Sequence, residues 1–359
     1  MKKILFYGYN MEMGGAERAL INVMNAIKDE YEIDLILIQD KGVLMNEIPK
    51  EVNVMTIRKN NISYALFRYI PFFRKIKIRR MTSKKKYDTA VAFMEGRAAT
   101  WLTDMNQMCK KVAWIHNDVN RFNIGISERE IKKTYSKIDR IAVVSKQSKD
   151  SFCKKYNMSE DKVEVVYNLI AEEEIKEKSL EFDPIKDKFT FVNVAKMRPQ
   201  KRHDRLLNAV KTLKDEGFNF QLWLIGNGPL EDDIKKMVDD LNISDYVSLL
   251  GLKTNPFPYI KKADFFVMSS DHEGYPLSLL EALLLKTPVI TTDVSGAEEI
   301  LKNDKYGIIC DVSLEGLTNA MRNILKNQDY SQIEKNLSNY KGANGGIVSQ
   351  LKELFEPEK

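Results

Sequence analysis

Two glutamates bracket a turn that could hold an anion. An apolar run at 263–268 is followed by a Gly-containing turn with Glu273, by Pro276, and by a stretch ending near Lys286 that carries Glu281. Proline is common at the first position of a helix, so this pattern predicts a strand that passes through a turn into a helix. The free N–H groups and the positive dipole end at the start of that helix suit a phosphate.

The spacing of the two carboxylates predicts one contact on either side of this anion. Helical residues rise about 1.5 Å each, so Glu281 should lie roughly 7 to 8 Å along the axis from Pro276. The two carboxylates could then hold a sugar on one side and a ribose on the other. A plain strand–turn–helix unit with two surface glutamates is the alternative.

The chain is long enough for two globular domains. It has 359 residues, of which 43% are hydrophobic and 30% charged, and such values describe neither a disordered nor a fibrous protein. The three cysteines lie far apart and no Cys-x-x-Cys pair occurs, which favours a reducing cytoplasm. No apolar run reaches the length that crosses a bilayer. The apolar residues after Lys2-Lys3 indicate a first strand rather than a signal peptide, because Glu12 interrupts them.

Positive charge is concentrated in the first half of the chain. Residues 1–180 hold 33 Lys+Arg against 24 Asp+Glu, whereas the remainder holds 23 against 27. Segment 66–86 interleaves aromatic and aliphatic residues with basic ones and contains no acid. Such a segment suits an anionic membrane surface. The basic residues predicted to meet that surface are Arg74, Lys75, Lys77, Arg79 and Arg80. An amphipathic helix docked on the sheet with a solvated basic face is the alternative, and nucleic acid is disfavoured because no recognised nucleic-acid module accompanies the patch.

Apolar strands alternate with helical stretches along the chain, which predicts an α/β fold with parallel sheets covered on both faces. The expected strands are 3–7, 33–38, 52–57, 88–94, 111–115, 140–144 and 163–166, then 189–194, 220–225, 247–250, 265–268, 289–291 and 307–310. We therefore expect two Rossmann-like domains, 1–170 and 188–329, joined by a charged linker or short exposed helix at 171–187. A final helical segment at 330–359 is expected to pack back toward the first domain. Ligand should bind at the carboxyl ends of the strands, in the cleft between the domains.

Several ordered motifs give the chain a family likeness over nearly its full length. The chain resembles the retaining glycosyltransferases of family 4, which have the GT-B fold of two Rossmann-like domains facing each other across a cleft. The matching segments are Gly14-Gly15-Ala16-Glu17-Arg18, Trp114-Ile115-His116-Asn117, Ala195-Lys196-Met197-Arg198-Pro199-Gln200-Lys201, Gly226-Asn227-Gly228-Pro229-Leu230, the Glu273-x7-Glu281 stretch, and Pro288-Val289-Ile290 with Gly296 and Glu298. Each motif alone is common, but their order, each at a strand end, is specific.

The resemblance implies a nucleotide-sugar donor site in the second domain. Glu273 is expected to bind the hydroxyls of the donor sugar and Glu281 those of the ribose, since a carboxylate holds a diol well. The loop residues that are expected to close over the sugar and the diphosphate are Gly274, Tyr275, Pro276 and Leu277. Gly226 and Gly228 are assigned to the same site, and the base is expected near Leu252-Lys253. Gly15 of the first domain lets backbone approach the phosphate.

Departure of the diphosphate generates negative charge that needs cations or N–H donors. No Asp-x-Asp motif occurs and the three histidines are scattered, so we expect no metal and no other cofactor. The resemblance nominates Lys196 and Lys201 instead, with two solvated lysines as the alternative. The usual Gly-Arg of this motif is Ala195-Lys196 here, and a lysine lacks the bidentate fork of arginine. Arg198 could take over part of that role.

His116 occupies the position where the family places a histidine near the reacting centre of the donor sugar. A satisfied histidine at a strand end is the alternative. Glu95 and Arg97, at the end of another strand, could line the acceptor cleft. In this class the departing phosphate takes the proton of the acceptor, so no protein nucleophile is nominated.

The prediction is therefore a metal-independent hexosyltransferase that uses a nucleotide sugar, with UDP favoured and GDP-mannose possible as the carrier. Its acceptor would be a lipid-linked or saccharide molecule in bacterial capsular, exo- or lipopolysaccharide synthesis, at the inner face of the cell membrane. Two rivals are a nucleotide-sugar epimerase of the same architecture and a catalytically silent nucleotide-sugar-binding protein. A dinucleotide dehydrogenase is disfavoured because Glu231 stands where the third glycine after Gly226 and Gly228 should be.

Overall fold

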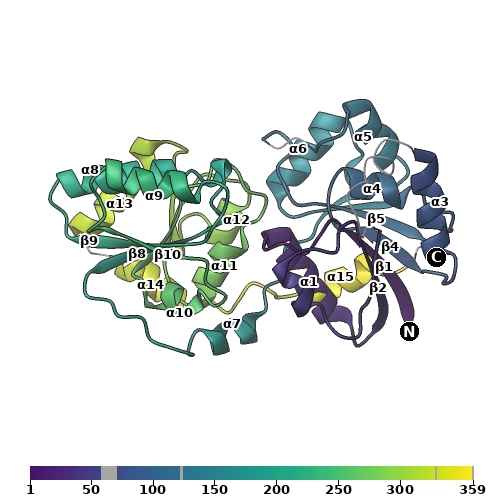
Figure 1. The fold of residues 1–359 in the computed structure, drawn as a ribbon, viewed down its shortest axis with the longest axis horizontal. Coiled ribbons are helices and arrows are strands. Elements are labelled where there is room, and N and C mark those ends of the chain that lie inside the picture. Colours follow the sequence, from purple (N-terminus) through teal and green to yellow (C-terminus); the bar gives the residue numbers. More distant parts are fainter. Residues whose placement is uncertain (58–70, 122–123, 328–329, 358–359) are drawn as a thin grey trace. The chain divides into compact units, whose positions relative to one another are not determined.

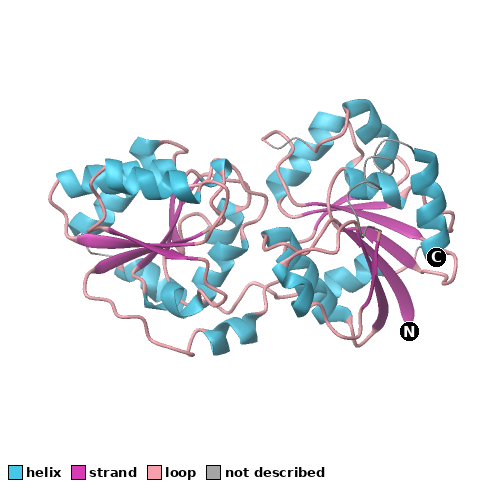
Figure 2. Cartoon of the chain, viewed as in Figure 1, coloured by secondary structure: helices cyan, strands magenta, loops and turns pink. Residues whose placement is uncertain are grey.

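The computed structural model describes residues 1–57, 71–121, 124–327 and 330–357. The chain divides into two compact units, one made of residues 1–169 with 344–359 and the other of residues 170–343. Each unit is an α/β sandwich with one parallel sheet between layers of helices (Figure 2). The expected fold class is thereby confirmed.

The described part of the first unit holds a seven-stranded sheet in the order β3-β2-β1-β4-β5-β6-β7. Its strands are β1 Lys2–Gly8, β2 Tyr31–Leu37, β3 Asn53–Thr56, β4 Thr89–Ala92, β5 Lys110–Ile115, β6 Arg140–Val143 and β7 Val163–Val165. One face is covered by α1 (Gly15–Ile27) and α15 (Ile347–Phe355), as Figure 1 shows. The other face carries α3 (Pro71–Thr82), α4 (Arg97–Leu102), α5 (Glu128–Tyr135) and α6 (Lys146–Tyr156). Two 3-10 turns, Val43–Glu47 and Glu160–Lys162, complete it.

The second unit is built in the same way around a sheet in the order β10-β9-β8-β11-β12-β13. The strands are β8 Phe189–Val194, β9 Phe220–Ile225, β10 Val247–Gly251, β11 Phe265–Met268, β12 Val289–Thr292 and β13 Gly307–Cys310. Helices α8 (His203–Asp215), α9 (Glu231–Asp240) and α13 (Leu314–Asn327) lie on one face of this sheet (Figure 1). On the other lie α7 (Glu172–Lys178), α10 (Phe257–Lys262) and α11 (Leu277–Leu284). The short helices α12 (Ala297–Leu301) and α14 (Ser331–Ser338) and a 3-10 turn at Pro199–Lys201 belong to the same unit.

Apolar strands explain why both sheets are covered on each face. Side chains of β8 and β11, such as Phe191, Phe265 and Val267, are fully buried. The Phe191 and Phe220 rings meet edge to face with centroids 5.8 Å apart. Strands that are apolar on both sides need helices on both sides.

The final helical segment expected at 330–359 is interrupted, which corrects the sequence-based prediction. Residues 339–346 separate α14 from α15, and Gly342 and Gly346 adopt φ angles of +113° and +77° there. Glycine reaches such angles at little steric cost, so it ends a helix readily. Helix α15 packs in the first unit, where the Phe355 carbonyl accepts a hydrogen bond of 2.7 Å from the Thr89 hydroxyl.

Each sheet has one place, here called its reversal, where successive strands stop being added on one side and are added on the other, although all strands stay parallel. In the second unit, β8 leads outward to β9 and β10 on one side, and β11 leads to β12 and β13 on the other. In the first unit the same reversal lies between β1 and β4. Ligands of open parallel sheets bind outside the carboxyl ends of the strands at such a reversal. Each unit therefore has one favoured position for a site.

Candidate functional site

The predicted donor residues of the second unit gather at its sheet reversal. The loop after β8 carries Lys196, Arg198 and Lys201, and the loop after the neighbouring β11 carries Glu273. The Lys201 ammonium lies 2.5 Å from Glu273 Oε1, and the two side chains are 20% and 11% exposed. The cation expected at the phosphate thus touches the carboxylate expected at the sugar, so this one contact joins both halves of the predicted site.

Two glycines bring the loop after β9 against the loop that carries the cations. A Cβ on Gly226 would lie 2.0 Å from the carbonyl oxygen of Ala195, and one on Gly228 would lie 2.5 Å from that of Met197. The Met197 N–H donates to Asn227 over 2.8 Å in the space this leaves. Gly226 and Gly228, predicted at the donor site, therefore hold two loops together.

The start of α11 has the form that the sequence predicts. Pro276 precedes the helix with an extended backbone and Glu281 lies half-buried in its body. Across the loop, Gly296 adopts a φ of +80°, and a Cβ there would lie 2.8 Å from the Tyr275 ring. Gly296 therefore packs against Gly274 and Tyr275 of this turn, and the turn leads directly into the start of α11.

Three charged residues at this reversal were not singled out from the sequence. Arg202, Arg205 and Asp271 form an ion-pair cluster between the two loops. Opposite charges near both motifs were visible, but only the adjacency of β8 and β11 brings them together.

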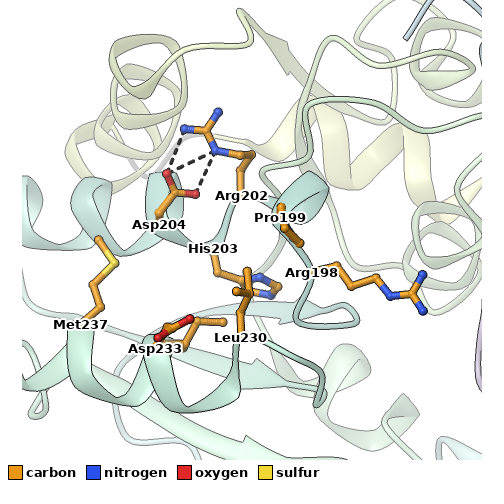
Figure 3. A pocket seen from close by; sticks show the side chains of 9 residues that line it. Arg198, Pro199, Arg202, His203, Asp204, Leu230, Asp233 and Met237 are labelled. Atoms are coloured by element: carbon orange, nitrogen blue, oxygen red, sulfur yellow. Dashed lines mark hydrogen bonds and ion pairs between the residues drawn. The ribbon is translucent and has the colours of Figure 1, made fainter. Parts of the chain in front are cut away.

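A pocket of about 380 Å³ lies between the starts of α8 and α9. Figure 3 shows Arg202 turned toward Asp204, and Arg198 extended away from Met237. His203 lines this pocket and is 2% exposed, and neither ring nitrogen has a hydrogen-bond partner among the residues that the structure describes. Burial, helped by the nearby Lys201 charge, lowers the pKa of His203 to about 4. His203 is therefore neutral at pH 7.

The predicted residues of the first unit also lie at strand ends near its reversal. Gly15 opens α1, and a Cβ placed on it would meet no atom within 4 Å. His116 follows β5, is buried, and lies with its ring parallel to Trp114 at a centroid distance of 6.0 Å. The space at Gly15 suits close approach of a ligand to the helix start.

The hydrogen bonds of His116 fix its protonation form. Its Nε2 lies 2.8 Å from the Phe93 carbonyl oxygen, which can only accept, so Nε2 carries the proton. Nδ1 then has a lone pair, and it is buried without a partner among the described residues. Burial lowers the pKa of His116, against opposing effects of Glu95 and the Phe93 carbonyl. The neutral ring can accept a hydrogen bond through Nδ1.

Glu95 lies beside His116 and shapes its loop. Its carboxylate accepts the His116 N–H over 3.2 Å and also a hydrogen bond from the Asn117 amide. Both Glu95 oxygens are thus engaged within the first unit. Arg97 begins α4 half-buried, and no ion pair to it is found in the described ranges. Of the two tentative acceptor residues, Arg97 keeps the more available polar group.

The basic segment is helical from Pro71, whereas its residues 66–70 lie outside the described ranges. Arg74 forms an ion pair of 2.5 Å with Asp104, with side chains only 12% and 6% exposed. Lys77 donates to the Ile57 carbonyl and Arg79 to that of Asp104. Three of the five predicted membrane residues thus bind the protein itself, although two of these three, Lys77 and Arg79, are exposed like Lys75 and Arg80.

Neither a metal cluster nor a membrane-spanning helix is found in the part of the chain that the structure describes. Its residues contain no group of three or more His, Cys, Asp or Glu that could hold a metal ion. None of its helices is both long and apolar enough to cross a membrane. Metal independence stays a prediction.

Two family models and several curated proteins match the chain. The model of Glycosyltransferase Family 4 matches residues 13–174, and that of Glycosyl transferases group 1 matches residues 173–341. A protein of Campylobacter jejuni is 28% identical over 350 residues, which cover 94% of this chain and 93% of the relative. Its name is N-acetylgalactosamine-N,N'-diacetylbacillosaminyl-diphospho-undecaprenol 4-alpha-N-acetylgalactosaminyltransferase. An Erwinia amylovora amylovoran biosynthesis glycosyltransferase, AmsK, is 29% identical over 40% of this chain and 36% of its own length.

Solved structures match the whole chain at low identity. TarM of S. aureus, in a complex that contains UDP, has a TM-score of 0.78 at 15% identity, covering 99% of this chain and 100% of TarM. Anabaena HepE with UDP and glucose has a TM-score of 0.79 at 17% identity, covering 98% and 99%. At this identity the likeness bears on the fold, and it confirms the expected GT-B architecture.

Proposed function

The chain belongs to glycosyltransferase family 4, and we propose that it transfers an N-acetylhexosamine from a UDP-sugar to a saccharide carried on a polyprenyl diphosphate. The Campylobacter jejuni relative supports this choice, because its name contains both that sugar class and a diphospho-undecaprenol acceptor. The amylovoran enzyme of Erwinia amylovora supports a place in bacterial surface polysaccharide synthesis. Of the nucleotide carriers expected from the sequence, UDP is favoured over GDP.

The contact of Lys201 with Glu273 at the sheet reversal carries the proposal. A departing nucleoside diphosphate accumulates negative charge on its phosphates, and a nearby ammonium lowers the free energy of that state. Lys201 supplies this cation, with Lys196 and Arg198 on the same loop. Glu273 accepts hydrogen bonds from the sugar hydroxyls, and its pairing with Lys201 orients it. Glu281 holds the ribose about one turn into α11.

The transfer itself needs bond exchange at one carbon. The bond between the anomeric carbon and the phosphate oxygen breaks, and the acceptor hydroxyl oxygen bonds to that carbon from the same face, so configuration is retained. The hydroxyl proton passes to the departing phosphate, which makes a protein base unnecessary. In the first unit His116 is neutral and is held by the contact of its Nε2 with the Phe93 carbonyl; its assignment to the donor sugar's reacting centre rests on the family resemblance.

We also propose peripheral contact between α3 and the anionic inner face of the cell membrane. Phe72 and Ile76, one helical turn apart, are 65% and 49% exposed, and Lys75 and Arg80 lie exposed beside them. Apolar anchors flanked by basic groups favour binding at a lipid headgroup layer. This contact would bring the enzyme to a lipid-linked acceptor.

A donor panel tests the proposed reaction. UDP-N-acetylhexosamines should raise the melting temperature more than GDP-mannose or ADP-glucose, since a ligand that binds only the folded state stabilises it by mass action. Radiolabelled sugar should then appear on a polyprenyl-diphosphate saccharide, with and without EDTA. Loss of transfer in EDTA would contradict metal independence. Epimerised donor formed without acceptor would favour the epimerase, and binding without any turnover would favour a silent binding protein.

A further inference from the structure

We propose that Asp271 is a positioning residue of the donor site, held between Arg202 and Arg205 so that the Glu273 loop keeps its place against the Lys201 loop. The proposal rests on the proposed function, because it assumes the donor roles of Glu273 and Lys201. It adds a residue whose side chain acts on the donor site through Arg202 and Arg205.

Arg202, Arg205 and Asp271 form a clasp between the two loops, and Arg205 is its inner, buried part. Its side chain is 5% exposed, and its two terminal nitrogens donate to different atoms of the β11 loop. One donates to the Ser269 carbonyl over 2.8 Å and the other to Asp271 Oδ1 over 2.6 Å. A buried guanidinium needs a carboxylate partner, and Asp271 is the acid that meets it. The pair therefore fixes both ends of a three-residue segment just before Glu273.

Arg202 forms the outer half and is held in an unusual backbone conformation. Its φ of +50° and ψ of +48° lie in the left-handed region, which disfavours side chains with a Cβ. Its Nη1 lies 3.1 Å from both oxygens of Asp271, while Nε and Nη2 bind Asp204. Since Arg202 follows Lys201 directly, its ion pair with Asp271 also holds the backbone of Lys201 in place beside the β11 loop.

Two hydrogen bonds to backbone carbonyls join the same loops as the ion pairs do. The Asp271 N–H donates to the Gln200 carbonyl and the Ser269 hydroxyl donates to the Lys201 carbonyl, each over 2.8 Å. Hydrogen bonds and ion pairs therefore both join the two loops, and the ion pairs add to the rigidity of this contact. If Asp271 loses its charge, two guanidinium groups face each other without a shared partner. The attraction of both guanidinium groups, which lie on the Lys201 side, for the β11 loop is then lost. The loops should therefore part, and Glu273 should move away from Lys201.

The proposal predicts a split between sugar-dependent and nucleotide-dependent properties. Glu273 serves the sugar, so its displacement should lower turnover, whereas UDP itself lacks the sugar and keeps Glu281 and the start of α11. Asp271→Asn should reduce kcat for the UDP-sugar that the wild type uses fastest by at least tenfold. The Kd of UDP should stay within threefold of the wild type. A residue that only supported the fold would change both alike.

Asp204→Asn is the matched control. Asp204 binds the same Arg202, but among the described residues no hydrogen bond or ion pair joins its carboxylate to the β11 loop. Its kcat should stay within twofold of the wild type. Asp271→Glu keeps the carboxylate and should restore turnover to within threefold, which covers the case of poor folding of Asp271→Asn. In a Glu273→Gln background, adding Asp271→Asn should cost less than threefold, because the two changes act through one group.

Hydrogen exchange tests the clasp without any donor. Amides of 269–277 should exchange at least tenfold faster in Asp271→Asn than in Asp204→Asn. Equal exchange in the two variants, or equal kcat, would overturn the inference. A wild type that turns over no UDP-sugar would overturn the proposed function instead, and the exchange result would still decide whether the clasp exists.

Discussion

Replacing Gly226 by alanine tests whether the two donor-site loops depend on close backbone approach. The added Cβ would lie 2.0 Å from the Ala195 carbonyl oxygen, where real contacts stay above 3.0 Å, so one loop must move by about 1 Å. Such overpacking costs about 1–3 kcal/mol, and the backbone φ of +144° adds about 1–3 kcal/mol for a non-glycine residue. We expect a loss of about 4 kcal/mol in the free energy of unfolding.

Urea denaturation and UDP titration measure the two consequences. The movement should break the hydrogen bond between Met197 and Asn227 and shift Lys196, so UDP should bind at least tenfold more weakly. Gly217→Ala is the control, because Gly217 has a φ of +83° but no atom within 4 Å of the added Cβ. It should lose only about 1–2 kcal/mol for the left-handed backbone and bind UDP normally. Equal stability of the two variants would refute the close-approach argument.

Three further predictions concern other parts of the chain. Glu281→Ala should weaken UDP binding at least tenfold in calorimetry, and unchanged affinity would remove its ribose role. For His203, the folded pKa of about 4 lies below the unfolded value of about 6.5, so the unfolded state binds the proton first and stability falls as pH drops through this range. His203→Leu should therefore abolish about 2 kcal/mol of the loss in unfolding free energy between pH 7 and pH 5, and an unchanged pH dependence would contradict this. On α3, the double variant Lys75→Gln with Arg80→Gln should reduce sedimentation with anionic vesicles at constant stability, and persistent vesicle binding by it would refute the membrane contact. Arg74→Met should instead lower the free energy of unfolding by about 3–5 kcal/mol, because it leaves Asp104 buried without its partner.

The strands could be predicted from the sequence nearly to the residue. Those at 189–194, 220–225, 265–268 and 307–310 coincide with β8, β9, β11 and β13. Each is a short apolar run between turn residues, a pattern that depends on local sequence alone. The break at 339–346 cannot be read from apolar periodicity, because the apolar residues on either side continue a helical pattern; its local signal is Gly342 and Gly346.

Side-chain partners across the sheet could not be predicted in the same way. The contact of Lys201 with Glu273 joins residues 72 positions apart and exists because β8 and β11 are neighbours. The Asp271 clasp depends on the same adjacency, and ion pairs leave no period in a sequence. Glu95 was expected at the acceptor, but its hydrogen bonds to the loop of His116 required the register of β4 beside β5.

The division of labour between Lys201 and Glu273 is tested most directly by comparing UDP with UDP-sugar in a Glu273→Gln variant. Calorimetry should give a UDP affinity within threefold of the wild type, because Lys201 remains available to the diphosphate. Transfer of radiolabelled sugar should fall at least a hundredfold, since the sugar loses its carboxylate contact. Transfer at the wild-type rate, or an equal loss of UDP binding and turnover, would contradict the assignment of Glu273 to the sugar.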